Sequence, residues 1–232
     1  MKKFLKSLSS AGLEINYALD PGLSLFGLNI SRAKHGYAER SALALSRCIS
    51  LEAKSVLDVG SGGGHQAASF AASGSTVTCV DYGTSVYAME SAPTNNVTVI
   101  NTDFAKWTPD KLYDLVWASH VLEHQRNVGE FIEKLIACCR PEGYVCIIVP
   151  TPHRRLWGGH VSLWTPGLLA YNIVLAGVDL KDADVRYGYR ESWILFKPRK
   201  IKLPALTFDS GDLDLLAPFL PCGFRENSEP WC

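Results

Sequence analysis

The chain lacks net charge, a long apolar run and any Cys-x-x-Cys pair, and each absence excludes a class of protein. Its 23 Lys and Arg balance 23 Asp and Glu among 232 residues, so we expect no electrostatic attraction to nucleic acid. The longest apolar stretch, 167–180, has about 14 residues, too few for a membrane span. Without a Cys-x-x-Cys pair, a cysteine zinc site is not expected.

The seven cysteines are an odd number and do not suggest a disulfide framework. Cys79, Cys138, Cys139 and Cys146 lie in apolar runs, and we expect buried thiols in a reducing compartment. The basic start, 1–6, is not followed by the continuous apolar region of a signal peptide. These observations predict a cytoplasmic protein.

What is present is a glycine-rich turn between an apolar run and a helical segment. Residues 55–59 predict a buried strand, Gly60, Gly62 and Gly64 follow at alternate positions, and 66–72 predict a helix. Glycines can adopt positive φ and let the backbone approach a ligand, and the amides at the start of the helix face the same space. The three parts together predict a nucleotide-binding site.

The dinucleotide-binding motif G-x-G-x-x-G is incomplete at this turn. Counting from Gly60, the third glycine of that motif is replaced by His65. An NAD-binding oxidoreductase also needs a catalytic pair such as tyrosine and lysine, which is not evident. That enzyme and a non-catalytic relative of the fold remain alternatives, although the latter predicts a degraded site and the glycines here are intact.

The pattern that fits is D-x-G-x-G-x-G from Asp58 onward, and with it the chain resembles the class I S-adenosylmethionine-dependent methyltransferases. The segment 113–124 matches their recurrent "YDLV…S…VLEH" pattern. A turn at 140–143 and an apolar strand at 144–150 follow, with Glu142 where the family has a glycine. The resemblance covers roughly residues 50–200.

The resemblance implies S-adenosylmethionine as methyl donor and a set of residues that bind it. Asp81, which ends the apolar run 76–80, is placed to accept both ribose hydroxyls. Asp103 meets the adenine amine in this scheme, while Phe104 packs on the ring. The residues expected to bind the cofactor are Asp58, Gly60, Ser61, Gly62, Gly64, Asp81, Tyr82, Asp103, Phe104, Ser119 and His120.

Strands and helices alternate between 55 and 150, which predicts an α/β fold with a doubly wound, mostly parallel, Rossmann-like sheet and helices on both faces. The resemblance implies seven strands with an antiparallel last strand, and segments 184–189 and 192–197 suit a hairpin. Parallel strands with right-handed crossovers end at one edge of the sheet. The residues expected to converge there are Asp58, Asp81, Asp103 and Ser119.

Three parts of the chain are expected. Residues 1–36 are interpreted as an N-terminal cover or lid, 37–200 as the S-adenosylmethionine-binding methyltransferase core, and 201–232 as a C-terminal extension. Residues 37–49 predict a helix that leads into the first strand, and 212–216 predict a short helix in the extension.

Methyl transfer to a hydroxyl group needs a base for the proton, and histidine suits this role near neutral pH. We expect His160, in the loop 157–166, to be that base, with His124 as the second catalytic candidate. Thr165 and Pro166 also predict a helix start, Thr165 as the cap. A purely structural role of the loop is therefore an alternative.

The string His120-x-x-Glu123-His124, together with His160, raises the alternative of a divalent metal site. It resembles the E-x-x-E-H motif of metal-assisted O-methyltransferases of the ubiquinone pathway and of small-RNA 2′-O-methyltransferases. Here His120 replaces the first Glu, which lowers the ligand charge and argues against Mg²⁺. We expect no metal and keep these four residues as the alternative.

The stretch 158–179 resembles methyltransferases of bacterial surface-polysaccharide gene sets. The resemblance implies a small-molecule or glycan acceptor, with a sugar hydroxyl as best candidate and Trp157 and Trp164 stacking on the sugar. The alternative acceptors are a quinone precursor and an RNA 2′-hydroxyl. The sequence thus predicts an enzyme that transfers a methyl group from S-adenosylmethionine, with neither nucleic acid nor membrane as expected partner.

Overall fold

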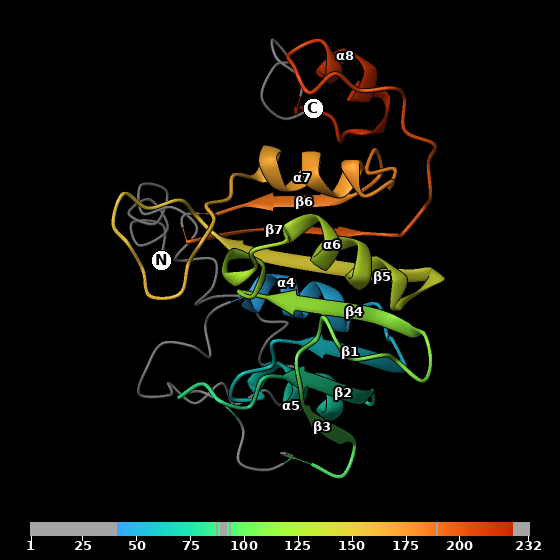
Figure 1. Cartoon of the computed structure of the whole chain (residues 1–232). Helices are drawn as coiled ribbons and strands as arrows, with labels where there is room; N and C mark the ends of the chain where they lie inside the picture. Colours follow the sequence, from blue (N-terminus) through green and yellow to red (C-terminus); the bar gives the residue numbers. More distant parts are fainter. Residues whose placement is uncertain (1–40, 87, 89–91, 93, 189, 225–232) are drawn as a thin grey trace, which may run out of the picture.

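The computed structural model describes residues 41–86, 88, 92, 94–188 and 190–224, which form one sheet with helices on both faces (Figure 1). The strands are β1 (Ser55–Val59), β2 (Thr76–Asp81), β3 (Val97–Asn101), β4 (Tyr113–Ser119), β5 (Cys139–Pro150), β6 (Asp184–Tyr187) and β7 (Glu191–Phe196). The helices are α4 (Ala42–Ile49), α5 (His65–Ala72), α6 (Val128–Ala137), α7 (Pro166–Leu175) and α8 (Asp212–Leu216), and the short 3-10 helices are η3 (Leu122–His124) and η4 (Ala217–Phe219). The predicted cover, 1–36, lies outside the described residues.

The sheet has seven strands in the order β3-β2-β1-β4-β5-β7-β6. Strands β3, β2, β1, β4 and β5 pair in parallel. Strand β7 pairs antiparallel with both β5 and β6. The predicted fold class, with its antiparallel last strand and its hairpin, is confirmed.

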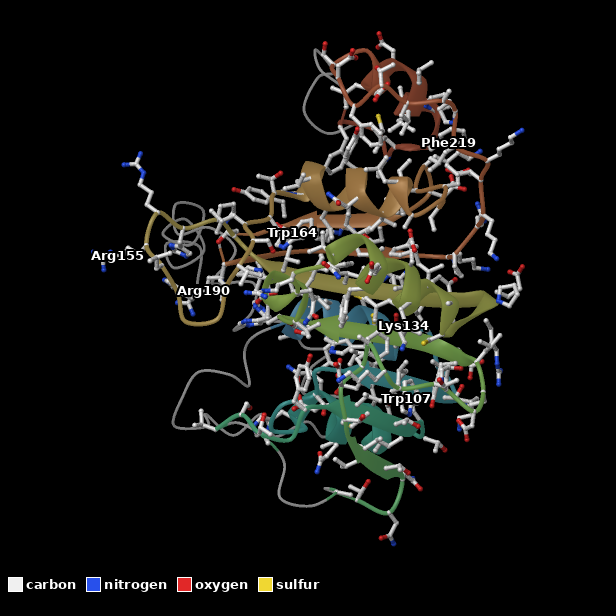
Figure 2. All side chains as sticks on the ribbon, viewed as in Figure 1. Trp107, Lys134, Arg155, Trp164, Arg190 and Phe219 are labelled. Carbon is white, nitrogen blue, oxygen red and sulfur yellow. The ribbon has the colours of Figure 1, made fainter. Side chains whose placement is uncertain are left out.

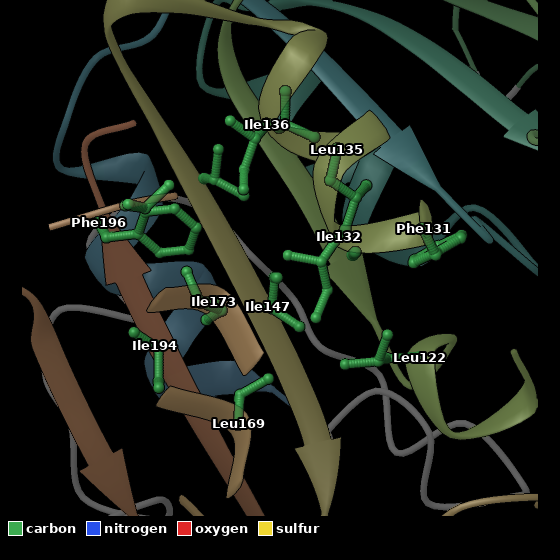
Figure 3. Close-up of a cluster of buried hydrophobic side chains, with 14 of the residues drawn as sticks. Leu122, Phe131, Ile132, Leu135, Ile136, Ile147, Leu169, Ile173, Ile194 and Phe196 are labelled. Atoms are coloured by element: carbon green, nitrogen blue, oxygen red, sulfur yellow. The ribbon is translucent and has the colours of Figure 1, made fainter. Parts of the chain in front are cut away.

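Alternating side chains of the parallel strands supply two hydrophobic cores, one on each face of the sheet. On β4, Val116 and Ala118 belong to one core, and Leu115 and Trp117 to the other, as the two-residue period of a strand requires. Helices α4 and α5 cover the face with Trp117. Helices α6 and α7 cover the opposite face, where Figure 3 shows residues of both helices around Ile147 of β5.

Strand β5 differs from the prediction at its start, because it begins at Cys139 and not at residue 144. The register pairs Tyr113 with Cys139 and Leu115 with Tyr144. Strand β4 thus advances two residues while β5 advances five, so 140–143 bulge out of the ladder, and three of these residues are exposed. The predicted turn is present as this bulge.

The C-terminal extension packs on the core at α7. Leu216 and Leu220 are buried in the same core as Ile173, and Leu180 N donates to the Phe219 carbonyl at 2.8 Å. Helix α8 confirms the helix predicted at 212–216.

The cysteines among the described residues are in two chemical states. Cys222, in the extension, is disulfide-bonded. The four thiols expected to be buried are buried and free, together with Cys48. Within the described ranges, none of the helices has the length and apolar character to cross a membrane.

Candidate functional site

A cavity of about 1400 Å³ opens at the edge where the parallel strands end. The glycine turn after β1, the ends of β2 and β4, and the loop 150–160 line it. Asp81, Asp103 and Ser119 reach this cavity as predicted. Asp58 does not line it, because its side chain is buried behind the turn at 2% exposure.

The turn has the backbone conformation that its glycines allow. Gly60, Gly62 and Gly64 have φ of 72°, 49° and 72°, which costs other residues about 1–2 kcal/mol each. A Cβ on Gly60 would lie 2.7 Å from Cγ2 of Val121. The turn therefore passes directly beneath the loop after β4, and Gly60 and Gly62 line the cavity whereas Gly64 starts α5.

Asp81 joins the glycine turn to the end of β2. Its Oδ2 accepts a hydrogen bond from Gly62 N at 3.0 Å, and its Oδ1 accepts one from Gly83 N at 2.9 Å. Each carboxylate oxygen has capacity for a further bond, so both can face ribose hydroxyls. The predicted role of Asp81 stays a prediction with suitable geometry.

The residues predicted around adenine are close together. Tyr82 Oη donates to Asp103 Oδ1 at 3.3 Å, and Ala105 N donates to the same oxygen at 2.9 Å. Phe104 lines the cavity but is largely buried, with its ring centroid 5.3 Å from that of Phe131. The side of this ring that faces the cavity is the surface on which adenine could pack.

The buried Asp58 has an unusual protonation equilibrium. Burial, with a smaller contribution from the negative charge of Asp81, raises the pKa of Asp58 to about 7. Its Oδ2 has no hydrogen-bond partner among the described residues. Near neutral pH the apo protein thus holds a carboxyl group that is partly protonated under the glycine turn.

Asp58→Asn is expected to flatten the dependence of stability on pH between about 4 and 7. The folded-state pKa of about 7 lies above the unfolded value of 3.8, so this group favours folding at acid pH, and that contribution disappears as the pH rises through 7. Between pH 4 and pH 8, the free energy of unfolding of the variant should rise by on the order of 2–4 kcal/mol relative to that of the unchanged protein. Urea unfolding at several pH values measures this.

Asp182→Asn is the control variant for that experiment, because it removes a carboxylate that lies on the surface and is paired with Arg199. Parallel pH curves for Asp58→Asn and the unchanged protein would show that Asp58 ionises normally.

At the other end of the cavity, Glu123 lies between two histidines. Its Oε1 is 3.9 Å from His124 Nε2 and 4.0 Å from His160 Nε2. Glu123 is only 1% exposed, and its Oε2 has no hydrogen-bond partner within the described part of the chain. The three side chains offer ligand atoms within 4.8 Å of one another, which brings together three of the four residues of the metal alternative.

The backbone fixes the proton on one of these rings. His124 Nδ1 lies 2.8 Å from the Gly159 carbonyl oxygen, which can only accept, so Nδ1 carries the hydrogen and the neutral ring has its lone pair on Nε2. The amides of Val161 and Ser162 donate to the Glu123 carbonyl at 2.8 and 3.3 Å. These bonds hold the loop of His160 against η3.

His120, the fourth residue of the metal alternative, has different partners. Its Nε2 lies 3.0 Å from Glu191 Oε2, and its Nδ1 lies 3.5 Å from Glu123 Oε1. Burial lowers the pKa of His120, but the bonds to Glu123 and Glu191 outweigh it and raise the pKa to about 9. Both ring nitrogens of His120 thus face carboxylates, which stabilise its protonated form at neutral pH.

Glu191 is the residue of this site that the sequence analysis missed. It is the first residue of a strand whose side chains are all buried, and a carboxylate in such a run is a signal that a partner exists. The partner could not be identified from sequence, since His120 is 71 positions away.

The aromatic residues of the loop differ from the prediction. Trp157 lines the cavity and is 44% exposed, whereas Trp164 is 2% exposed and donates to Ser162 Oγ at 2.9 Å. Figure 2 shows Trp164 beside α7, away from Arg155 on the outer part of the loop. The prediction that Trp164 stacks on a sugar is therefore wrong. The predicted cap is confirmed, because Thr165 Oγ1 accepts from Leu168 N at 3.1 Å.

The site and the fold together define a class of enzyme. A family model described as a methyltransferase domain matches residues 31–174, more than half of the chain. The chain belongs to this methyltransferase family, and its sheet order and glycine turn are those of the class I S-adenosylmethionine-dependent methyltransferases.

Curated relatives match over a shorter range. The ubiquinone biosynthesis O-methyltransferase of Rickettsia felis is 37% identical over 98 residues, and that of Rickettsia akari is 38% identical over 100 residues. Each match covers 40% of this chain. The chain spans about two-fifths of the length of these relatives.

Solved structures show the same fold. The 1,6-didemethyltoxoflavin-N1-methyltransferase of Burkholderia thailandensis, with bound 1,6-didemethyltoxoflavin and S-adenosylhomocysteine, is 23% identical with a TM-score of 0.55. The match covers 69% of this chain and 78% of that chain. The DhpI–S-adenosylhomocysteine complex is 20% identical with a TM-score of 0.57, covering 77% and 95%.

Proposed function

We propose that this protein transfers the methyl group of S-adenosylmethionine to a hydroxyl group of a small-molecule acceptor. The observation that carries the proposal is the single cavity that joins the glycine turn and Asp81 to the Glu123–His124–His160 cluster. One end has the groups that suit a nucleoside, and the other has bases that suit a hydroxyl proton.

The reaction needs little more than alignment and a proton acceptor. The hydroxyl oxygen attacks the methyl carbon as the carbon–sulfur bond breaks, and S-adenosylhomocysteine leaves with the bonding electrons. His160 takes the hydroxyl proton, and Glu123, 4.0 Å from its Nε2, stabilises the imidazolium. His124 is the second candidate base, with its free lone pair at Nε2 facing the same carboxylate.

For the acceptor we favour a phenolic small molecule. The relatives named ubiquinone biosynthesis O-methyltransferases support this choice, within the two-fifths of their length that matches. A glycan acceptor has less support because, of the two tryptophans expected to stack on a sugar, Trp157 lines the cavity and Trp164 is buried.

Calorimetry with S-adenosylmethionine and with NAD, followed by transfer of a labelled methyl group to catechol and to other small phenols, tests the function. We expect binding of S-adenosylmethionine, no binding of NAD and labelled product. Failure to bind S-adenosylmethionine would refute the function. Binding without transfer to phenols, but with transfer to glucose-type sugars, would move the acceptor to the glycan class.

A divalent cation at Glu123, His124 and His160 is the second candidate, favoured by the orphaned Oε2 of buried Glu123. The donor set fits a borderline metal better than Mg²⁺, since two of the three ligands are imidazoles. When bound, such a cation would lower the pKa of the acceptor hydroxyl. Glu123 would supply the charge, and the Gly159 carbonyl would orient His124.

Chelation separates the two candidates. If a metal assists, EDTA lowers methyl transfer at least about tenfold, and Zn²⁺ or Mn²⁺ restores it better than Mg²⁺. Calorimetry of the apo protein with Zn²⁺ should then show binding that Glu123→Gln removes. Full activity in EDTA, with no metal detected by elemental analysis, leaves the histidine base as the mechanism.

A further inference from the structure

The antiparallel course of β7 brings a carboxylate to the site from a part of the chain beyond the family match. Because β7 runs against β5, its first residue lies at the edge where the parallel strands end, and Glu191 pairs with Pro150 in the register. Glu191 is 5% exposed and lines the cavity. It lies outside residues 31–174, which the family model matches.

Glu191 is held from one side by the start of α4. Ser41 N donates to Oε1 at 2.9 Å and to Oε2 at 3.1 Å, and Ser41 Oγ donates to Oε2 at 3.3 Å. Ser41 Oγ also lies 2.8 Å from Ser119 Oγ. Since Ser41 Oγ has one hydrogen, Ser119 is the donor of that second bond when Ser41 donates to Glu191.

His120 completes the arrangement from the other side. Its ring lies between Glu191 at 3.0 Å and Glu123 at 3.5 Å, one carboxylate at each nitrogen. Its backbone is in the left-handed region, with φ of 55°, and its amide donates to the Ile148 carbonyl at 3.0 Å. A non-glycine residue with this φ at a cavity wall indicates that the surroundings determine its conformation.

We propose that Glu191 is a positioning residue for methyl transfer. It orients the His120 ring, and the ring in turn fixes the Glu123 carboxylate opposite His124 and His160. Two contacts connect these residues: Glu191 Oε2 lies against His120 Nε2, and His120 Nδ1 lies against Glu123 Oε1. Glu123 Oε1 is the oxygen that both catalytic candidates face. The proposal rests on the proposed function, because it assigns a role at the same acceptor site.

The test is a double-mutant cycle with Glu191→Gln and His120→Asn. Glutamine keeps the size of Glu191 without its charge, and asparagine tolerates positive φ but cannot reach both carboxylates. Each single variant should lower kcat for transfer of a labelled methyl group to catechol about tenfold. Glu191→Gln should leave the dissociation constant of S-adenosylmethionine unchanged. Since both act through one chain of contacts, the double variant should be no slower than the slower single variant.

Imidazole ¹⁵N spectra give a readout that does not need the acceptor. Glu191→Gln should shift the signals of His124 and His160, because His120 and Glu123 connect Glu191 to both rings. Glu142→Gln, a surface charge paired with Lys197, controls for charge alone.

Three results would overturn the role of Glu191. These are unchanged kcat in Glu191→Gln, independent effects that multiply in the double variant, and a loss of thermal stability in Glu191→Gln that accounts for the whole loss of rate. Absence of methyl transfer by the unchanged protein would instead refute the proposed function. The two failures are thus distinguishable.

Discussion

Gly60→Ala should weaken binding of S-adenosylmethionine about 30-fold or more. The added Cβ lies 2.7 Å from Cγ2 and 2.9 Å from Cβ of Val121, so either the turn or the loop after β4 must move. The φ of 72° adds strain of about 1–2 kcal/mol, which alone corresponds to roughly a 5- to 30-fold change in an equilibrium. The glycine turn and the loop after β4 both line the cavity, so movement of either one changes its shape. Calorimetric titration with S-adenosylmethionine measures the loss.

Gly74→Ala is the matched control for this substitution. Gly74 has φ of 96°, and a Cβ there meets nothing within 4 Å. It carries the backbone strain without the clash, in the turn after α5. We expect Gly74→Ala to lower stability against urea, by less than Gly60→Ala does, and to leave the affinity for S-adenosylmethionine unchanged. Equal affinity of both variants, or normal binding by Gly60→Ala, would show that the glycine turn does not hold the cofactor.

The glycine turn and the sheet were predictable because their signals are local. A buried strand of five residues, alternating glycines and a following helix lie within 18 consecutive positions, 55–72. The end of a parallel strand fixes where Asp81 and Ser119 lie, whatever the loops do. Such residues can be placed from sequence once the strands are recognised.

The acceptor end was less predictable because its contacts join distant segments. Glu191 meets Ser41 across 150 positions and His120 across 71. The string around Glu123 suggested a four-residue metal set, yet Glu191 competes for His120 and leaves three residues facing one another. Asp58 shows the same limit on a smaller scale. The sequence pattern identified Asp58 as part of the motif, but it did not predict that the side chain is buried behind the turn.

His160→Ala should lower kcat about 10²- to 10⁴-fold, the usual contribution of a general base. The dissociation constant of S-adenosylmethionine should stay within about threefold, because His160 belongs to the acceptor end, beside Glu123 and Trp157. His124→Ala should cost less if His160 is the base, since His124 then takes no proton from the acceptor. Steady-state rates of labelled methyl transfer to catechol, together with calorimetry, measure these effects.

His153→Ala is the matched control, as it removes an imidazole from the same loop. His153 stacks on Trp157 with ring centroids 4.8 Å apart and has no contact with Glu123 among those described. Its loss should raise KM for the phenol more than it lowers kcat, because it supports a ring that lines the cavity. If His124→Ala instead shows the large loss of kcat and His160→Ala does not, the fixed lone pair of His124 identifies it as the base. If neither variant loses rate, proton transfer needs neither a histidine base nor a metal held by these two histidines.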